Sequence, residues 1–208
     1  MPPNLVTGFF HLSGAISLVI PGATAKVLLH SELCMSLASL LSSEQIIPEM
    51  EATERWPAIV ELIDLLVQQG KIKEASRESI LAALKQREET MSTGIGFGIA
   101  IPHASSDDVE EVVAAFGRSS KGIEFDALDN APVKFVVLFI VPKNQFQTHL
   151  RTLAAIAKFL NDRSVRERLA KAETNEEILR IFQEPPPSSS RPASVAAPAS
   201  NATQTPSS

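Results

Sequence analysis

The chain has 208 residues, 44% of them hydrophobic and 21% charged, which suits one sizeable domain with an aliphatic core. Its net charge of −5 argues against a nucleic-acid-binding protein, which needs a basic face to neutralise phosphates. A single cysteine, Cys34, excludes a disulfide framework and a cysteine-based zinc site. The longest apolar run, 135–141, is far shorter than the ~20 residues of a membrane span.

The first residues show no helical or alternating pattern and carry few charges. We therefore expect residues 1–35 to be a poorly ordered leader, or an over-extended start if Met35 is the true initiator. They also lack the basic segment that opens a signal peptide, since Lys26 is the first cation. A cytoplasmic location is the corresponding expectation.

Two helices are expected next. Apolar residues at steps of three and four indicate an amphipathic helix that stops at Gly70: Trp56, Ile59, Ile63, Leu66 and Val67. Ser76 is placed to cap a second helix, whose end carries Arg87.

Extended segments follow this helical pair. Residues 98–102 are predicted to be extended, because the residue before Pro102 is disfavoured in a helix. Residues 112–116 and 133–141 are strand candidates. The second is apolar on both faces, which is typical of a central strand.

The rest of the chain is predicted to be helical up to its polar tail. One helix is expected to begin near Thr148, and capping boxes open two short helices at Ser164 and Thr174. Residues 185–208 are rich in Pro, Ser and Ala and predict disorder. The alternation indicates an α/β fold with a single domain, 36–184, in which helices flank a mixed central sheet, and a disordered C-terminal tail.

Two histidines occupy positions that favour chemistry. His103 follows a short strand and Pro102, so its ring would be presented with little rotational freedom. His149 lies where the strand 133–141 has ended and a helix starts, a place that attracts anions in α/β proteins. A surface loop histidine and an ordinary first-turn residue are the alternative interpretations.

Arg87 and the glycines after it also have two interpretations each. The Arg87 guanidinium could bind a phosphoryl group, or it could simply complement the dipole at the end of its helix. Gly94, Gly96 and Gly98 form neither a P-loop nor a dinucleotide fingerprint, so they are either a phosphate cradle or turn and bulge glycines. A basic cluster interspersed with acids is expected to be a solvated helix surface: Lys158, Arg163, Arg166, Arg168 and Lys171.

The stretch REETMSTGIGFGIAIPHA, residues 87–104, resembles the active-site signature of type-2 enzyme IIA domains of the bacterial phosphoenolpyruvate-dependent sugar phosphotransferase system. This family includes fructose, mannitol and nitrogen-regulatory members. Residues 121–160 resemble it as well, and the similarity covers about 36–184. Arg87 and His149 lie sixteen residues before and forty-six residues after His103, as in the family.

The resemblance implies a phosphocarrier without metal or other cofactor. His103 would accept a phosphoryl group from phospho-HPr on Nε2 and pass it to a IIB protein or domain. Arg87 and His149 would stabilise the group in transit. Separate partners are implied, with no nucleic acid and no membrane insertion.

Other functions remain compatible with these residues. One is a nitrogen-type regulatory IIA, a module whose binding to regulatory protein targets is switched by phosphorylation of His103, without sugar transport. Another is a metal site built on His103 and His149, although no carboxylates stand at motif positions.

Overall fold

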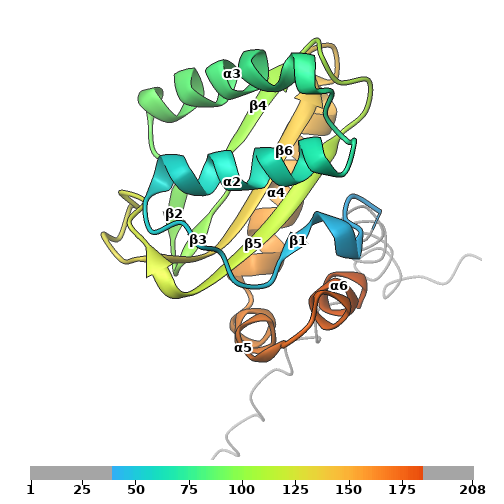
Figure 1. Cartoon of the computed structure of the whole chain (residues 1–208). Coiled ribbons are helices and arrows are strands. Elements are labelled where there is room, and N and C mark those ends of the chain that lie inside the picture. Colours follow the sequence, from blue (N-terminus) through green and yellow to red (C-terminus); the bar gives the residue numbers. More distant parts are fainter. Residues whose placement is uncertain (1–38, 185–208) are drawn as a thin grey trace, which may run out of the picture.

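The computed structural model describes residues 39–184, which form one α/β domain (Figure 1). Its helices are α2 (Arg55–Gln68), α3 (Arg77–Thr90), α4 (Phe146–Asn161), α5 (Arg163–Lys171) and α6 (Asn175–Gln183), with short 3-10 turns at Ser43–Gln45 and Glu74–Ser76. Its strands are β1 (Ile46–Ile47), β2 (Gly94–Gly96), β3 (Ile99–Ala100), β4 (His103–Ser106), β5 (Val113–Ile123) and β6 (Val133–Pro142). The predictions for 1–35 and 185–208 lie outside the described residues.

The six described strands form one mixed sheet, as the sequence predicts. Its order is β1-β5-β6-β3-β2, and β4 also pairs with β6. β5 runs antiparallel to β6, whereas β3 and β4 run parallel to it one after the other. β6 therefore has neighbours on both sides and is the central strand.

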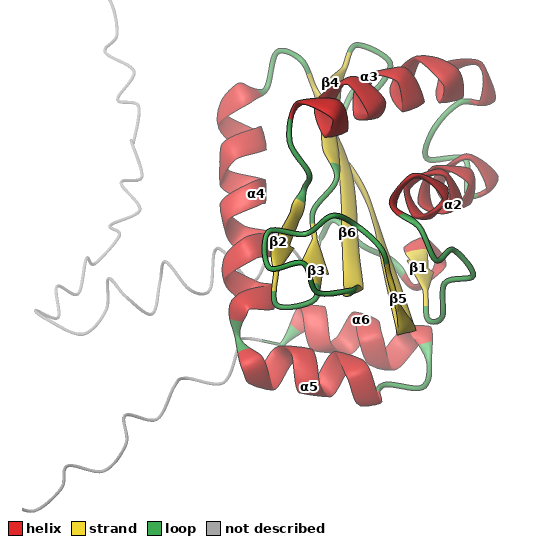
Figure 2. Cartoon of the chain, turned by 90° about the vertical axis from the view of Figure 1, so that its left-hand side faces the viewer, coloured by secondary structure: helices red, strands yellow, loops and turns green. Residues whose placement is uncertain are grey.

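Helices cover both faces of the sheet, and alternate side chains of β6 enter two separate cores (Figure 2). Leu138 and Ile140 pack against α2 and α3. Val137 and Phe139 face α4, α5 and α6. This two-sided burial explains why 133–141 is apolar throughout instead of alternating.

The predicted helix ends at Gly70 and Thr174 are confirmed, whereas Ser76 stands at the N-cap of α3 but its side chain makes no capping hydrogen bond. α2 is followed by Gly70 in the left-handed region, with φ of 67°. Thr174 caps α6 by accepting from the N–H of Glu177. The predicted cap of α5 at Ser164 is wrong: Asp162 caps this helix, because its carboxylate accepts from the N–H groups of Ser164 and Val165. No helix among residues 39–184 is both long and apolar enough to cross a membrane.

Arg118 on β5 ties the C-terminal end of α5 to the sheet. Its Nε donates to the carbonyl oxygen of Pro48 at 2.7 Å, and its Nη1 donates to those of Leu169 at 2.9 Å and Ala172. The carbonyl groups of Leu169 and Ala172 lie at the end of α5, where a helix leaves carbonyls without intrahelical donors.

Arg118→Ala should lower the free energy of unfolding by about 2–3 kcal/mol, because it removes charge-assisted hydrogen bonds from partly buried carbonyl groups. Urea denaturation measures this loss. Arg163→Ala is the matched control on α5, since its ion pair with Glu167 is exposed and should contribute little. Equal stability of the two variants would contradict the structural role of Arg118.

Candidate functional site

His103 is the first residue of β4 and is only 7% exposed, so it is not a surface loop histidine. Its ring stacks on Phe139 of β6 at 5.4 Å between ring centres. Its Nδ1 lies 2.7 Å from the carbonyl oxygen of Ile101. Because a carbonyl oxygen can only accept, Nδ1 carries the proton in the neutral ring, and the lone pair is on Nε2.

Arg87 lies in the last turn of α3 and reaches the same ring. Its Nε–H donates to Nε2 of His103 at 3.2 Å, and its Nη1 donates to the carbonyl oxygen of Met91 at 2.8 Å. The second contact satisfies a carbonyl at the helix end, so the dipole interpretation of Arg87 also holds. The guanidinium of Arg87 thus donates a hydrogen bond to the lone pair on Nε2 of His103, from a position fixed by α3.

His149 completes the group from the first turn of α4. Its ring centre lies 5.0 Å from that of His103, with the two planes at 87°, and 5.6 Å from that of Phe139. Its Nδ1 lies 3.3 Å from the Oγ of Ser105. The fold therefore brings together all three residues that the sequence singled out, from α3, β4 and α4.

A pocket of about 420 Å³ lies in front of these side chains, between α3 and α4. Among the described strands β4 pairs only with β6, so its other edge faces this pocket, and Figure 2 shows the strand between the two helices. The lining residues are Ala83, Gln86, Arg87, Thr90, His103, Ala104, Ser105 and His149. The lining therefore offers both polar and apolar groups to a ligand.

Both histidines are held in the neutral form. Burial lowers the pKa of His103 from 6.5 to about 4, opposed by its hydrogen bond to Ile101 and helped by the charge of Arg87 and, once it is protonated, that of His149. Burial, followed by the charge of Arg87, also lowers the pKa of His149. At neutral pH the Nε2 atom of His103 therefore carries no proton.

This shift predicts a pH dependence of stability. Between pH 6.5 and about 4 the unfolded chain binds a proton at His103 that the native chain does not. The free energy of unfolding should therefore fall as the pH drops through this window, by roughly 3 kcal/mol from this group, and His149 adds in the same direction. The free energy of unfolding, measured by urea denaturation at several pH values from 4 to 7, should depend less steeply on pH for His103→Gln than for the unsubstituted chain. The same pH dependence for both chains would contradict the lowered pKa of His103.

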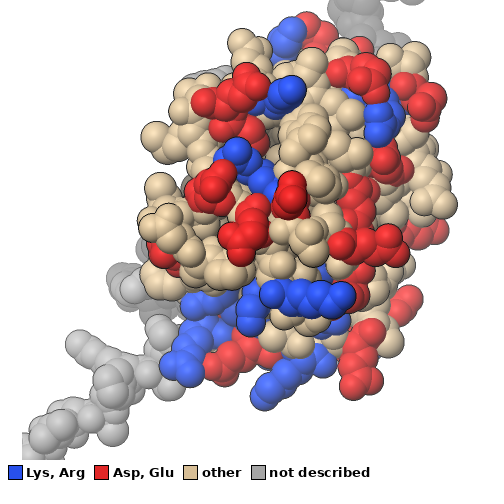
Figure 3. Space-filling view, turned by 60° about the vertical axis from the view of Figure 1, so that its left-hand side comes forward, with Lys and Arg blue, Asp and Glu red and all other residues tan. Residues whose placement is uncertain are grey.

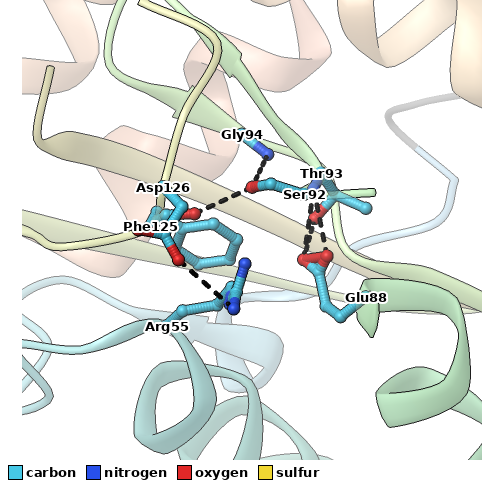
Figure 4. Close-up of polar contacts among 7 residues, drawn as sticks. All are labelled: Arg55, Glu88, Ser92, Thr93, Gly94, Phe125 and Asp126. Carbon is cyan, nitrogen blue, oxygen red and sulfur yellow. Dashed lines mark hydrogen bonds and ion pairs between the residues drawn. The ribbon is translucent and has the colours of Figure 1, made fainter. Parts of the chain in front are cut away.

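The chain that leaves α3 is anchored by a buried acid that the sequence analysis did not single out (Figure 4). Glu88 is 6% exposed, and its carboxylate accepts from the backbone N–H of Thr93 at 3.0 Å and from the Thr93 hydroxyl at 2.5 Å. Glu88 directly follows Arg87, so this contact fixes the end of the helix that carries the guanidinium. The sequence pattern that could have indicated this contact is an acid in the last turn of a helix followed five positions later by a residue with a hydroxyl group.

Ser92 extends this anchor to the neighbouring loop. Its hydroxyl donates to the carbonyl oxygen of Phe125 at 2.8 Å and accepts from the N–H of Gly94 (Figure 4). Gly94 also lies against Ala127, since a Cβ on it would lie 2.8 Å from two atoms of that residue. The path of β2 is therefore set by close packing.

The glycine-rich stretch forms the β2–β3 hairpin and does not line the pocket. Gly96 and Gly98 have positive φ angles of 91° and 73°, and the strand register shifts between Gly94 and Gly96. These features agree with the interpretation as turn and bulge glycines, and none of the three glycines lines the pocket in front of His103.

Three members of the basic cluster are exposed, as expected for a solvated surface, whereas Arg166 and Arg168 are half-buried. Figure 3 shows basic side chains gathered along the lower part of one face, at the level of α5. Arg163 pairs with Glu167, and Arg168 pairs with Glu184. These cations neutralise acids on and beside their own helix.

A metal site would need further protein ligands. Within residues 39–184, no group of three or more His, Cys, Asp or Glu side chains could hold a metal ion. His103 and His149 therefore have no third protein ligand in the described part of the chain.

Comparison with known proteins agrees with this geometry. Residues 39–184 match the family model described as phosphoenolpyruvate-dependent sugar phosphotransferase system, EIIA 2. The PTS system fructose-specific EIIA component of Haloferax volcanii is 38% identical over 141 residues, which are 65% of this chain and 90% of that protein. The fructose-specific EIIABC component of Bacillus subtilis is 33% identical over 150 residues, 72% of this chain and 23% of that protein.

A solved structure gives the same result in three dimensions. The crystal structure of nitrogen regulatory protein IIA-Ntr from Neisseria meningitidis superposes with a TM-score of 0.64 at 30% identity, covering 71% of this chain and 99% of that one. The chain belongs to the EIIA 2 family of the phosphoenolpyruvate-dependent sugar phosphotransferase system, which includes fructose-specific and nitrogen-regulatory members.

Proposed function

We propose that this protein is a phosphocarrier, that His103 accepts a phosphoryl group on Nε2, and that residues 36–184 are the functional unit. The observation that carries the proposal is the fixed tautomer of this ring. Nδ1 donates to the carbonyl oxygen of Ile101, so the lone pair of Nε2 is directed toward Arg87 at the pocket. A nucleophile held in one orientation needs little further ordering before the transfer step.

The donor in this proposal is phospho-HPr. Its P–N bond breaks as a P–N bond forms to Nε2 of His103, and the donor nitrogen leaves with the electron pair of the broken bond. The phosphoryl group passes in line between the two nitrogens, with its charge spread over three equatorial oxygens. The proton on Nδ1 of His103 stays on its hydrogen bond to Ile101 throughout.

Arg87 and His149 stabilise the charge of the group in transit. Arg87 exchanges its contact with Nε2 for contacts with the phosphoryl oxygens, and its planar donor fork suits two of them. The ring of His149 offers an N–H from the other side of the pocket. The buried position of His103 strengthens these interactions, because water screens them less.

The onward acceptor is a IIB protein or domain. A weakly basic histidine is a good leaving group, and the lowered pKa of His103 favours release of the phosphoryl group to a second protein. The Bacillus subtilis relative, which is named an EIIABC component, supports a IIB partner for a chain of this family.

A regulatory role is the second candidate, supported by the similarity to the nitrogen regulatory protein of Neisseria meningitidis. In this role the charge of phospho-His103 switches binding to a protein target, and no sugar is transported. The chemistry on His103 is the same for both roles.

Phosphoryl exchange measured with purified components tests the proposal. The full chain, incubated with phosphoenolpyruvate, enzyme I and HPr, should gain one acid-labile, alkali-stable phosphate. Adding a fructose-type IIB protein should then discharge it. A chain that takes up no phosphate would refute the phosphocarrier proposal, and one that is charged but does not discharge to IIB would favour the regulatory role.

A further inference from the structure

Ser105 lies two residues after His103 on β4, so the two side chains leave the same face of the strand. The intervening Ala104 packs in the core under α2 and α3. Ser106 also points to that side, where its hydroxyl donates to Asp108. Strand geometry therefore presents His103 and Ser105, but not their neighbours, to His149 of α4.

The two histidines face different partners at Nδ1. His103 faces a backbone carbonyl oxygen at 2.7 Å, which can only accept, and this contact leaves its Nε2 unprotonated. His149 faces the hydroxyl of Ser105 at 3.3 Å, and a hydroxyl can donate. When Ser105 donates, Nδ1 of His149 is the acceptor, and the single proton of the neutral ring is on Nε2.

The opposite arrangement would work against a phosphoryl group. With its proton on Nδ1, a neutral His149 would turn a lone pair toward anionic oxygens at Nε2. With its proton on Nε2, it donates a hydrogen bond to them. A nucleophile and a donor in one pocket thus require opposite tautomers, and the two different partners at Nδ1 supply them.

We propose that Ser105 is a positioning residue, whose hydroxyl donates to Nδ1 of His149 and keeps the proton of that ring on Nε2, ready for a phosphoryl oxygen. Its effect on transfer rests on the phosphocarrier function proposed above. Its effect on the tautomer of His149 does not, because the Ser105–His149 contact exists in the uncharged protein.

Nitrogen NMR of the uncharged full chain tests the tautomer directly. The ¹⁵N shifts of His149 should report a protonated Nε2 and an unprotonated Nδ1, and those of His103 the reverse. Ser105→Ala should give His149 a mixture of both tautomers, whereas Ser105→Thr, which keeps a hydroxyl, should retain the single form. A proton on Nδ1 of His149 in the unsubstituted chain would overturn the proposal, whether or not the protein carries phosphate.

Rates of transfer from phospho-HPr test the functional consequence. Ser105→Ala should slow transfer about 3- to 10-fold, the effect of one neutral hydrogen bond, and Ser105→Thr should restore most of the rate. Ser106→Ala is the matched control, because it removes a hydroxyl one residue along that points away from the pocket, and its rate should be unchanged.

A double substitution separates positioning from a merely structural role. If Ser105 acts through His149, the chain with both Ser105→Ala and His149→Ala should be no slower than His149→Ala alone. If Ser105→Ala slows transfer by the same factor in both backgrounds, Ser105 does not act through His149 and the proposal is wrong. A chain that never takes up phosphate would refute the phosphocarrier function and leave the NMR result to decide the tautomer.

Discussion

His103→Gln should abolish phosphoryl acceptance completely, because it removes the Nε2 lone pair that the proposed transfer uses, and the lone pair of His149 at Nδ1 is engaged by Ser105. Glutamine is similar in size and keeps an amide donor for the carbonyl oxygen of Ile101, so the variant should remain folded. The measurement is the amount of phosphate taken up from phosphoenolpyruvate through enzyme I and HPr, with circular dichroism as the check on folding.

The matched control for this loss is His149→Gln, which removes the second ring of the pocket. It should still reach one phosphate per chain, only more slowly, if His149 assists the group without carrying it. Stoichiometric labelling of His103→Gln would assign the phosphate to another residue and refute the proposed site.

Arg87→Ala should slow transfer in both directions by roughly 10²–10³-fold, because a positioned cation is lost where charge concentrates in the transition state. His149→Ala should have the same direction and a smaller effect, since a neutral donor forms a weaker hydrogen bond than a charged one. Single-turnover mixing with phospho-HPr measures the inward step, and mixing the charged protein with IIB measures the outward step.

Lys85→Ala is the control for Arg87→Ala, because it removes another cation from α3. Lys85 is exposed and lies over the ring of Trp56, on a different part of the helix surface from the pocket. The transfer rates of Lys85→Ala should match those of the unsubstituted chain.

Arg87→Ala should also raise the pKa of His103, since the guanidinium charge helps to lower it. Unchanged rates in both directions would remove Arg87 from the site.

The position of His149 shows which features of the site the sequence pattern predicts and which it does not. The pattern of the chain predicts a helix beginning near Thr148, and α4 begins two residues earlier, at Phe146. That expectation placed His149 in a first helical turn beyond the central strand. The sequence pattern did not say which ring faced it, because that depends on the register in which His103 lies opposite Phe139.

Local sequence patterns determined the fold class, the central strand and most helices of this protein, because periodicity and end signals act over a few residues. The spacing of the motif residues also identified Arg87, His103 and His149 as candidate site residues. Only the tertiary structure decided which nitrogen of His103 is free, how far its pKa falls, and that Ser105 contacts His149 while the glycines form a hairpin. These properties depend on burial and on contacts between residues far apart in the chain, and such contacts arise only when β4 is fixed between α3 and α4.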